Sequence, residues 1–411
     1  MLLPKATLNR LVCLAALAAL CFAGCSVAGP AAGNQPWPEG SNPSAAHLGT
    51  RAGSLILFIG DGMGPGIVSL AKVYSDKALE VELNMVALAA TGRLGMATTY
   101  SNNKLVTDSA AGATALATGS KTNNGMVGIA ADGSRLENLF EKALRAGKSV
   151  GVVTTTAVTD ATPAGFLAHS SSRDAEFNIA TQIVEGGASV VMGGGSAYFL
   201  PAGLPEGQGL RSDGRDLTEE ARDRGFDVAR DKEGLRAAEG TKILGLFATQ
   251  DIPFEGDRRD FETPSLSDMF KAALRVLTAD PDGFVLVVEG GRIDHAEHDN
   301  LLGVALGELL AFDAALGHAM DYQSSDSTLT IVVTADHDTG APALTATEKG
   351  YPPVEDAANL TAEGFGFVKW LSGSHTGTMV PVIARGPGEE RFSGFKDNTD
   401  LNRAMVSVLG L

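Results

Sequence analysis

An aspartate stands in a glycine-rich turn directly after the first predicted strand of the chain. The run Ser54–Gly60 is typical of a buried strand, and it leads into Gly60-Asp61-Gly62-Met63-Gly64. A carboxylate at the end of such a strand can bind a metal ion. A Gly-Asp-Gly turn also occurs as a simple chain reversal, so Asp61 alone does not decide between the two interpretations.

A serine follows in a run of small residues, Thr107-Asp108-Ser109-Ala110-Ala111-Gly112-Ala113-Thr114, which predicts the start of a helix. Ser109 would then lie near unpaired backbone N–H groups, which attract anions and stabilise an alkoxide. This position makes Ser109 a candidate nucleophile. The alternative is that Asp108 or Ser109 serves only as a helix cap.

Acids and two histidines follow the apolar run Phe284–Val288 in Glu289-Gly290-Gly291-Arg292-Ile293-Asp294-His295-Ala296-Glu297-His298. The i, i+4 spacing of Asp294 and His298 places both on one face of a helix, where together they can hold zinc. A solvated acidic helix start is the alternative interpretation.

Two more candidate sites lie further along the chain. Asp336-His337 follows the apolar run Leu329–Thr334, so acids or histidines follow three predicted strands. His375 stands in Gly373-Ser374-His375-Thr376-Gly377, just before another apolar run. His375 can complete a ligand set, although a lone histidine is more often a satisfied buried residue.

The elements that would position these residues alternate between short apolar runs and helical patterns. This alternation predicts an α/β fold with a mostly parallel sheet covered by helices on both faces, and ligands outside the carboxyl ends of the strands. The predicted strands are Ser54–Gly60, Val150–Thr155, Ser189–Met192, Phe284–Val288 and Leu329–Thr334. The predicted helices are Ser134–Ala146, Asp174–Glu185, Leu266–Leu277 and Leu301–Tyr322.

Two stretches are expected to depart from this alternation. Ala202–Asp260 is rich in Arg, Asp and Glu, and Ala341–Ser372 has the composition of a loop-like insert. We expect one large catalytic domain over residues 54–411.

The first residues have the features of an export signal. Lys5 and Arg10 precede an uncharged run, Leu11–Gly24, which is too short for a membrane span of ~20 residues. Phe22-Ala23-Gly24-Cys25 resembles a bacterial lipoprotein signal, which predicts a signal over 1–24, lipidation of Cys25, and a Pro-, Gly- and Ser-rich tether over 25–53. The protein is then expected at a membrane, facing the periplasm or in the outer membrane. Ordinary signal cleavage near Ala23 or Ala28 is the alternative.

The composition is that of a folded, acidic protein. A net charge of −17 excludes a basic surface for nucleic acid, and 44% hydrophobic with 20% charged residues is sufficient for a large core.

The ordered motifs of residues 54–410 resemble those of the alkaline phosphatase family. They are Gly-Asp-Gly-Met-Gly, Thr-Asp-Ser-Ala-Ala, Asp-Ala-Thr-Pro-Ala, Glu-Gly-Gly-Arg-Ile-Asp-His, Thr-Ala-Asp-His-Asp and His-Thr-Gly. Most members of that family are homodimers, which we therefore expect here. The insert Ala341–Ser372 falls where members carry a variable lobe.

The resemblance implies a role for each matching residue. Ser109 would be the nucleophile and Arg173 would clamp the phosphate, with Asp108 orienting the guanidinium. Two zinc ions and one magnesium ion would be bound, and Asp61 would serve two sites. The implied ligands are Asp61, Asp336 and His337 for one zinc, Asp294, His298 and His375 for the other, and Asp61, Thr162 and Glu289 for magnesium. Asp160 and His295 would influence the magnesium and the phosphate without being ligands.

The implied activity is hydrolysis of small phosphate monoesters to alcohol and phosphate through a phosphoserine intermediate. Another hydrolase of the same superfamily is an alternative, such as a phosphodiesterase, a phosphonate hydrolase or a sulfatase. The sulfatase run Cys/Ser-x-Pro-x-Arg is missing, because Ala111 and Ala113 stand at the Pro and Arg places after Ser109. A non-catalytic phosphate- or metal-binding lipoprotein would have no use for Ser109.

Overall fold

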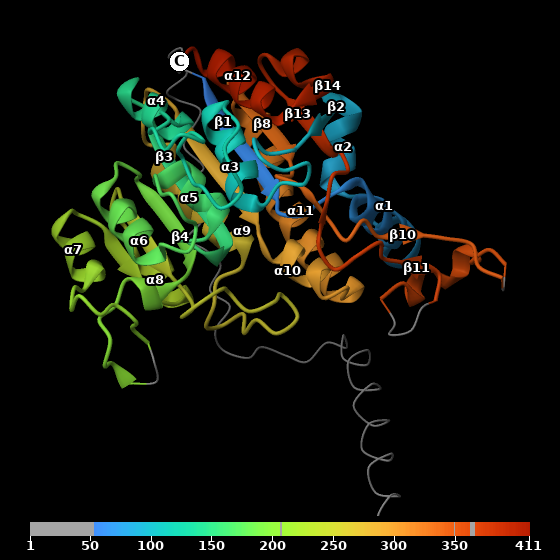
Figure 1. The fold of residues 1–411 in the computed structure, drawn as a ribbon, viewed down its shortest axis with the longest axis horizontal. Helices are drawn as coiled ribbons and strands as arrows, with labels where there is room; N and C mark the ends of the chain where they lie inside the picture. Colours follow the sequence, from blue (N-terminus) through green and yellow to red (C-terminus); the bar gives the residue numbers. More distant parts are fainter. Residues whose placement is uncertain (1–52, 206–207, 349, 362–365) are drawn as a thin grey trace, which may run out of the picture. The chain divides into compact units, whose positions relative to one another are not determined.

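The computed structural model describes residues 53–205, 208–348, 350–361 and 366–411 (Figure 1). The predicted signal over 1–24, Cys25 and all of the predicted tether except Gly53 lie outside the described residues.

A sheet of ten strands forms the centre of the described structure, in the order β14-β2-β13-β8-β1-β7-β3-β4-β6-β5. The strands β8, β1, β7, β3, β4, β6 and β5 are parallel to their neighbours, whereas β13 is antiparallel to both β8 and β2. The strands are β1 Ser54–Gly60, β2 Arg93–Thr98, β3 Ser149–Ala157, β4 Val190–Gly194, β5 Asp227–Ala229, β6 Ile243–Leu246, β7 Phe284–Gly290, β8 Leu329–Thr334, β13 Val380–Arg385 and β14 Gly394–Asp397.

Helices cover this sheet in two groups. In the first group, α9 and α11 contact each other and the central strands β1, β3, β7 and β8. In the second group, α4 contacts α5 and α12, and these three helices contact the central strands β1, β3 and β7. The helices are α1 Pro65–Tyr74, α2 Asn84–Thr91, α3 Ser109–Thr118, α4 Leu139–Arg145, α5 Ala161–Leu167, α6 Glu176–Glu185, α7 Leu217–Asp223, α8 Lys232–Ala237, α9 Leu266–Leu277, α10 Arg292–His298, α11 Leu302–Ser325 and α12 Asn398–Leu409. The prediction of a mostly parallel α/β sheet is confirmed.

The central strands are buried over their whole length, as continuous apolar runs require when a sheet is covered on both faces. Every residue of β1, β7 and β8 is buried. The long helix α11 has the length and composition of a membrane span, but it packs against these three strands and carries buried Glu308 and Asp313. It is therefore a core helix of this fold.

The predicted start of one helix is wrong. The prediction placed it at Ser134, whereas α4 begins at Leu139. Asn138 accepts a hydrogen bond from the Glu141 backbone N–H (2.9 Å), and the Glu141 carboxylate accepts one from the Asn138 N–H (3.0 Å). This reciprocal capping box fixes the helix start five residues later than the pattern indicated.

The expectation that Ala202–Asp260 departs from the strand and helix alternation is also wrong. This segment contains α7, β5, α8 and β6, and its two strands continue the parallel sheet beyond β4. The strand β5 has only three residues, so the alternation of its side chains was too short to recognise in a charged sequence.

The insert Ala341–Ser372 contains little regular structure, as predicted. The short strands β10 (Ala343–Leu344) and β11 (Val368–Lys369) pair in it, and a 3₁₀ segment covers Val354–Asn359. The insert contacts α1 and the π-helical turn Ser75–Leu79 (Figure 1).

Candidate active site

Three adjacent parallel strands end at one edge of the sheet and deliver the candidate ligands there. In the register of the sheet Ile59 of β1 lies beside Glu289 of β7 and Thr334 of β8. Asp61 lies two residues after Ile59, and Asp336 lies two residues after Thr334. Both therefore reach the same edge of the sheet as Glu289. The side chains of all three acids are buried.

Asp61, Asp336 and His337 form the first cluster of metal-ligating groups, and their ligand atoms lie within 4.8 Å of one another. His337 Nε2 lies 3.4 Å from Asp61 Oδ1 and 3.3 Å from Asp336 Oδ2. The second oxygen of Asp336, Oδ1, accepts hydrogen bonds from the backbone N–H groups of Gly62 and His337. The carboxylate of Asp336 is thus held with Oδ2 directed at the cluster.

Ser109 is the first residue of α3 and lies against this cluster. Its Oγ is 3.1 Å from His337 Nε2, and the side chain is 4% exposed. A Cβ on Gly112, one turn further along α3, would come within 2.9 Å of the Asp336 carbonyl oxygen. Glycine therefore allows α3 to approach the end of β8 closely enough to bring Ser109 to the ligands.

Asp294, His298 and His375 form the second cluster. The helix α10 carries Asp294 and His298 one turn apart, with His298 Nε2 3.2 Å from Asp294 Oδ2. His375 comes from a distant part of the chain, because β12 (His375–Thr376) pairs with β9 (Asp338–Thr339), which begins directly after His337. The ring of His375 stacks on that of His337 with centroids 3.6 Å apart, so the two clusters are adjacent.

Backbone carbonyl groups orient both imidazoles of the second cluster. His298 Nδ1 lies 3.0 Å from the Gly373 carbonyl oxygen, and His375 Nδ1 lies 2.9 Å from that of Thr107. An Nδ1–H that donates to a carbonyl leaves Nε2 with its lone pair available, which is the arrangement of histidines that bind zinc. The two Nε2 atoms are 3.0 Å apart.

Asp61, Thr162 and Glu289 offer a third group of oxygens. Asp61 Oδ1, Thr162 Oγ1 and Glu289 Oε1 are buried and make no hydrogen bond within the described residues. Thr162 is close enough to Glu289 to lower the pKa of that carboxyl group, against the larger effect of burial. A set made only of oxygens suits magnesium, whereas the two clusters that contain imidazole suit zinc.

The electrostatics of the site favour bound cations. Burial, reinforced by neighbouring acids, raises the pKa of Asp61 well above its usual value. Burial raises the pKa of Glu289 to about 8, and burial with Asp294 raises that of Asp336 to about 7. Burial also lowers the pKa of His337, which keeps its imidazole in the neutral form that binds metals. Divalent cations would compensate the buried carboxylates.

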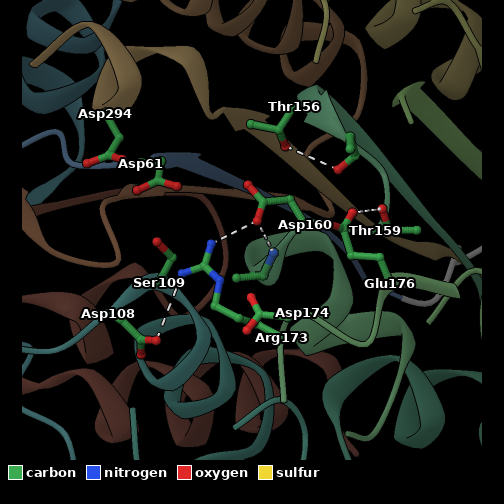
Figure 2. Close-up of polar contacts among 12 residues, drawn as sticks. Asp61, Asp108, Ser109, Thr156, Thr159, Asp160, Arg173, Asp174, Glu176 and Asp294 are labelled. Carbon is green, nitrogen blue, oxygen red and sulfur yellow. Dashed lines mark hydrogen bonds and ion pairs between the residues drawn. The ribbon is translucent and has the colours of Figure 1, made fainter. Parts of the chain in front are cut away.

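Arg173 extends towards this edge from the loop before α6. Its Nη2 lies 2.8 Å from Asp160 Oδ1, and its Nη1 lies 3.9 Å from Asp108 Oδ2 (Figure 2). Burial alone would lower the pKa of Arg173, but Asp160 and Asp108 hold it above its usual value. Asp108 also caps α3 by accepting a hydrogen bond from the Ala111 N–H (3.0 Å), so the capping interpretation applies to Asp108.

His295 has contacts of a different kind. Its Nδ1 lies 2.7 Å from Arg292 Nη1, and Arg292 also pairs with Asp251 at 3.0 Å. The guanidinium of Arg292 stacks on the ring of Phe254 at 3.8 Å. The structure therefore places His295 beside the site in a separate charged group.

Several residues that support the ligands were not identified from the sequence. The hydroxyls of Thr154 and Thr156 donate to Glu289 Oε2, and that of Thr339 donates to Asp294 Oδ1. The run Thr154-Thr155-Thr156, unusual at the end of an otherwise apolar strand, was a signal that could have identified two of them.

Comparison with known proteins agrees with this geometry. The family model described as alkaline phosphatase matches residues 52–363. The repressible alkaline phosphatase of Saccharomyces cerevisiae is 39% identical over 324 residues, which cover 72% of this chain and 56% of the yeast protein. The streptomycin-6-phosphate phosphatase of Streptomyces griseus is 35% identical over 453 residues, which cover 92% of this chain and 99% of that protein.

A solved structure shows the same fold. The crystal structure of Thermus thermophilus alkaline phosphatase superimposes with a TM-score of 0.79 at 32% identity, covering 92% of this chain and 96% of the other. The family match extends over most of the chain, and the buried acids and histidines converge at the carboxyl ends of its strands. On these grounds, the chain belongs to the alkaline phosphatase family.

Proposed function

We propose that this protein hydrolyses phosphate monoesters to an alcohol and inorganic phosphate through a phosphoserine intermediate on Ser109. The observation that carries the proposal is the position of Ser109 Oγ, 3.1 Å from His337 Nε2 in a buried cluster that contains Asp61 and Asp336. A protein that only bound phosphate would not need a hydroxyl at this point.

The residues present fit two zinc ions and one magnesium ion. Asp61, Asp336 and His337 would hold one zinc, and Asp294, His298 and His375 would hold the other. Asp61, Thr162 and Glu289, with their unpartnered oxygens, would hold magnesium. When bound, these ions would offset the negative charge of the reacting oxygens and lower the pKa of water and of the serine hydroxyl.

The residues of the chain then have distinct tasks in two displacements. The Ser109 hydroxyl gives its proton to water as its oxygen attacks phosphorus, the bond from phosphorus to the alcohol oxygen breaks, and the alcohol leaves with a proton from water. A water molecule then loses a proton and attacks the phosphoserine, the bond to the Ser109 oxygen breaks, that oxygen takes up a proton, and phosphate is released. Arg173 binds two non-bridging oxygens throughout, because a planar guanidinium fits them with paired hydrogen bonds.

Hydrolysis of p-nitrophenyl phosphate beside bis-p-nitrophenyl phosphate tests the proposed substrate class. We expect kcat/KM to be much higher for the monoester, because its phosphoryl group carries one more non-bridging oxygen and more negative charge than that of the diester, and so interacts more strongly with Arg173 and the proposed metal ions. A preference for the diester would assign the chain to the diesterase branch of the superfamily instead.

Arg173→Ala should weaken the binding of phosphate and its monoesters by about 10- to 100-fold, because charge-assisted hydrogen bonds are lost. The zinc and magnesium content should not change, since Arg173 is a ligand in none of the three sets. Arg403→Ala, at an exposed position of α12, is the matched control. Inhibition by inorganic phosphate and metal analysis provide the measurements. Loss of zinc from Arg173→Ala would show that the residue is structural.

We further propose that the protein is a lipoprotein anchored through Cys25. Cys25→Ala should release the activity into the soluble fraction, while Cys21→Ala should leave it with the membranes, since Cys21 lies within the predicted signal. Fractionation with mass spectrometry of the N-terminal peptide measures both. Wild-type activity in the soluble periplasmic fraction, with no lipid on Cys25, would end the anchor proposal and leave the phosphatase proposal intact.

A further inference from the structure

Two side-chain contacts join the segment that carries Arg173, the proposed phosphate-binding residue, to a neighbouring segment. The neighbouring segment is the loop that follows β3 and carries Thr159 and Asp160, and the Arg173 segment runs from Arg173 to Glu176 at the start of α6. Asp160 Oδ1 pairs with Arg173 Nη2 at 2.8 Å, and the Thr159 hydroxyl donates to Glu176 Oε2 at 2.7 Å (Figure 2). The two contacts lie close together along both segments, because Thr159 precedes Asp160 and Glu176 lies three residues after Arg173.

The hydrogen bond between Thr159 and Glu176 carries a larger desolvation cost than a purely structural contact would need. Thr159 is fully buried, and burial raises the pKa of the Glu176 carboxyl group. No lysine or arginine pairs with Glu176 among the described residues. A pair of apolar side chains would join the same segments at a lower desolvation cost. The polar pair is therefore better explained by the fixed position that its hydrogen bond gives the two segments.

The start of α6 lacks a side-chain cap. The residue before the helix is Ala175, which offers no side chain to cap the first N–H groups. Glu176 is the first residue of the helix, and its carboxylate is the group through which this end contacts Thr159. The backbone of Arg173 is held on its other side by a hydrogen bond to the Gly125 carbonyl oxygen (2.8 Å).

Among the described residues, the Arg173 guanidinium has one carboxylate partner within hydrogen-bonding distance. Asp160 is within hydrogen-bonding distance, but Asp108 at 3.9 Å is not. Asp160 in turn accepts a hydrogen bond from the Ala161 N–H (2.7 Å), so its own position is tied to the start of α5. A shift of the segment that carries Arg173 relative to the Thr159–Asp160 loop would therefore move the guanidinium away from its single close partner.

We propose that Glu176, acting through Thr159, is a positioning residue that holds Arg173 in the geometry required to bind the phosphoryl group. The proposal rests on the proposed phosphatase function, in which Arg173 contacts the substrate. Glu176 itself contacts neither substrate nor metal.

Glu176→Ala and Thr159→Val each remove the link. We expect each to raise KM for p-nitrophenyl phosphate and to weaken phosphate binding, measured by calorimetry, by about 5- to 10-fold, the effect of one hydrogen bond. The turnover number and the zinc and magnesium content should stay close to wild type. Glu176→Gln should restore most of the affinity, because its amide oxygen can still accept from Thr159. Glu185→Ala, at the exposed far end of α6, is the matched control.

A double-mutant cycle separates positioning from general stabilisation. In the Arg173→Ala background, Glu176→Ala should cause no further loss of phosphate affinity, since the group that it positions is absent. The same 5- to 10-fold loss in both backgrounds, or a loss of metal from Glu176→Ala, would overturn the proposal. If one single variant does not fold, the other carries the test. Because calorimetry reads phosphate binding directly, a wild type that binds phosphate without hydrolysing esters would refute the proposed function and not this inference.

Discussion

Replacing Ser109 with alanine is expected to lower the turnover of phosphate monoesters by about 10³-fold or more, because the covalent route requires the serine oxygen. The substitution should slow the chemical step and leave the fold of the protein unchanged. Ser109 is the first residue of α3, and the cap of that helix is the neighbouring Asp108, so the loss of one hydroxyl should leave the helix in place.

Three measurements distinguish this outcome from a general loss of structure. The variant should keep its metals and its affinity for inorganic phosphate, and acid-quenched wild-type protein should carry phosphate on Ser109 that the variant lacks. Ser134→Ala, in an exposed turn, serves as the control for serine removal. Near-normal turnover by Ser109→Ala would rule out the nucleophile assignment.

Chelation should reduce turnover by a similar factor, and zinc should restore activity where magnesium alone does not. Magnesium prefers oxygen ligands, whereas His298, His337 and His375 offer nitrogen. Metal analysis of the reconstituted protein should give two zinc ions and one magnesium ion per chain. Recovery with magnesium alone would contradict the zinc assignment.

Removal of the metals should also lower the free energy of unfolding, which thermal melting measures independently of activity. Asp61, Glu289 and Asp336 are buried close together, and burial, reinforced by neighbouring acids, raises their pKa values. Cations bound to the folded state remove this cost and stabilise the protein by mass action. An unchanged melting temperature after complete chelation would show that these acids do not bind the ions.

The parts of the fold that were predictable share a physical cause. The strands β1 and β8 have the predicted bounds, because a strand buried on both faces is a continuous apolar run with clear ends. The helix α9 also has its predicted bounds, since its capping box begins at Ser265. Most of the candidate ligands stand directly after such a strand or on a short helix, whereas Thr162 was assigned only through the family resemblance and His375 stands before an apolar run.

The remaining features depend on contacts between distant segments, which periodicity does not record. The pairing of Thr159 with Glu176, and the group of Asp251 with Arg292, each join residues whose neighbours in the sequence give no sign of a partner. The place of His375 depends on a two-residue strand beside β9. Such short pairings become visible only in three dimensions.

The ligands of the site are spread along the chain from Asp61 to His375, and the last of them is brought to the others by β12 pairing with β9. A nascent chain that has been synthesised only as far as β9 therefore possesses all three residues of the first cluster but lacks His375 of the second. Full metal occupancy becomes possible only after long-range pairing is complete, so ion uptake should be a late event in folding. In a pulse-chase experiment, zinc content would then report on chains that have finished folding.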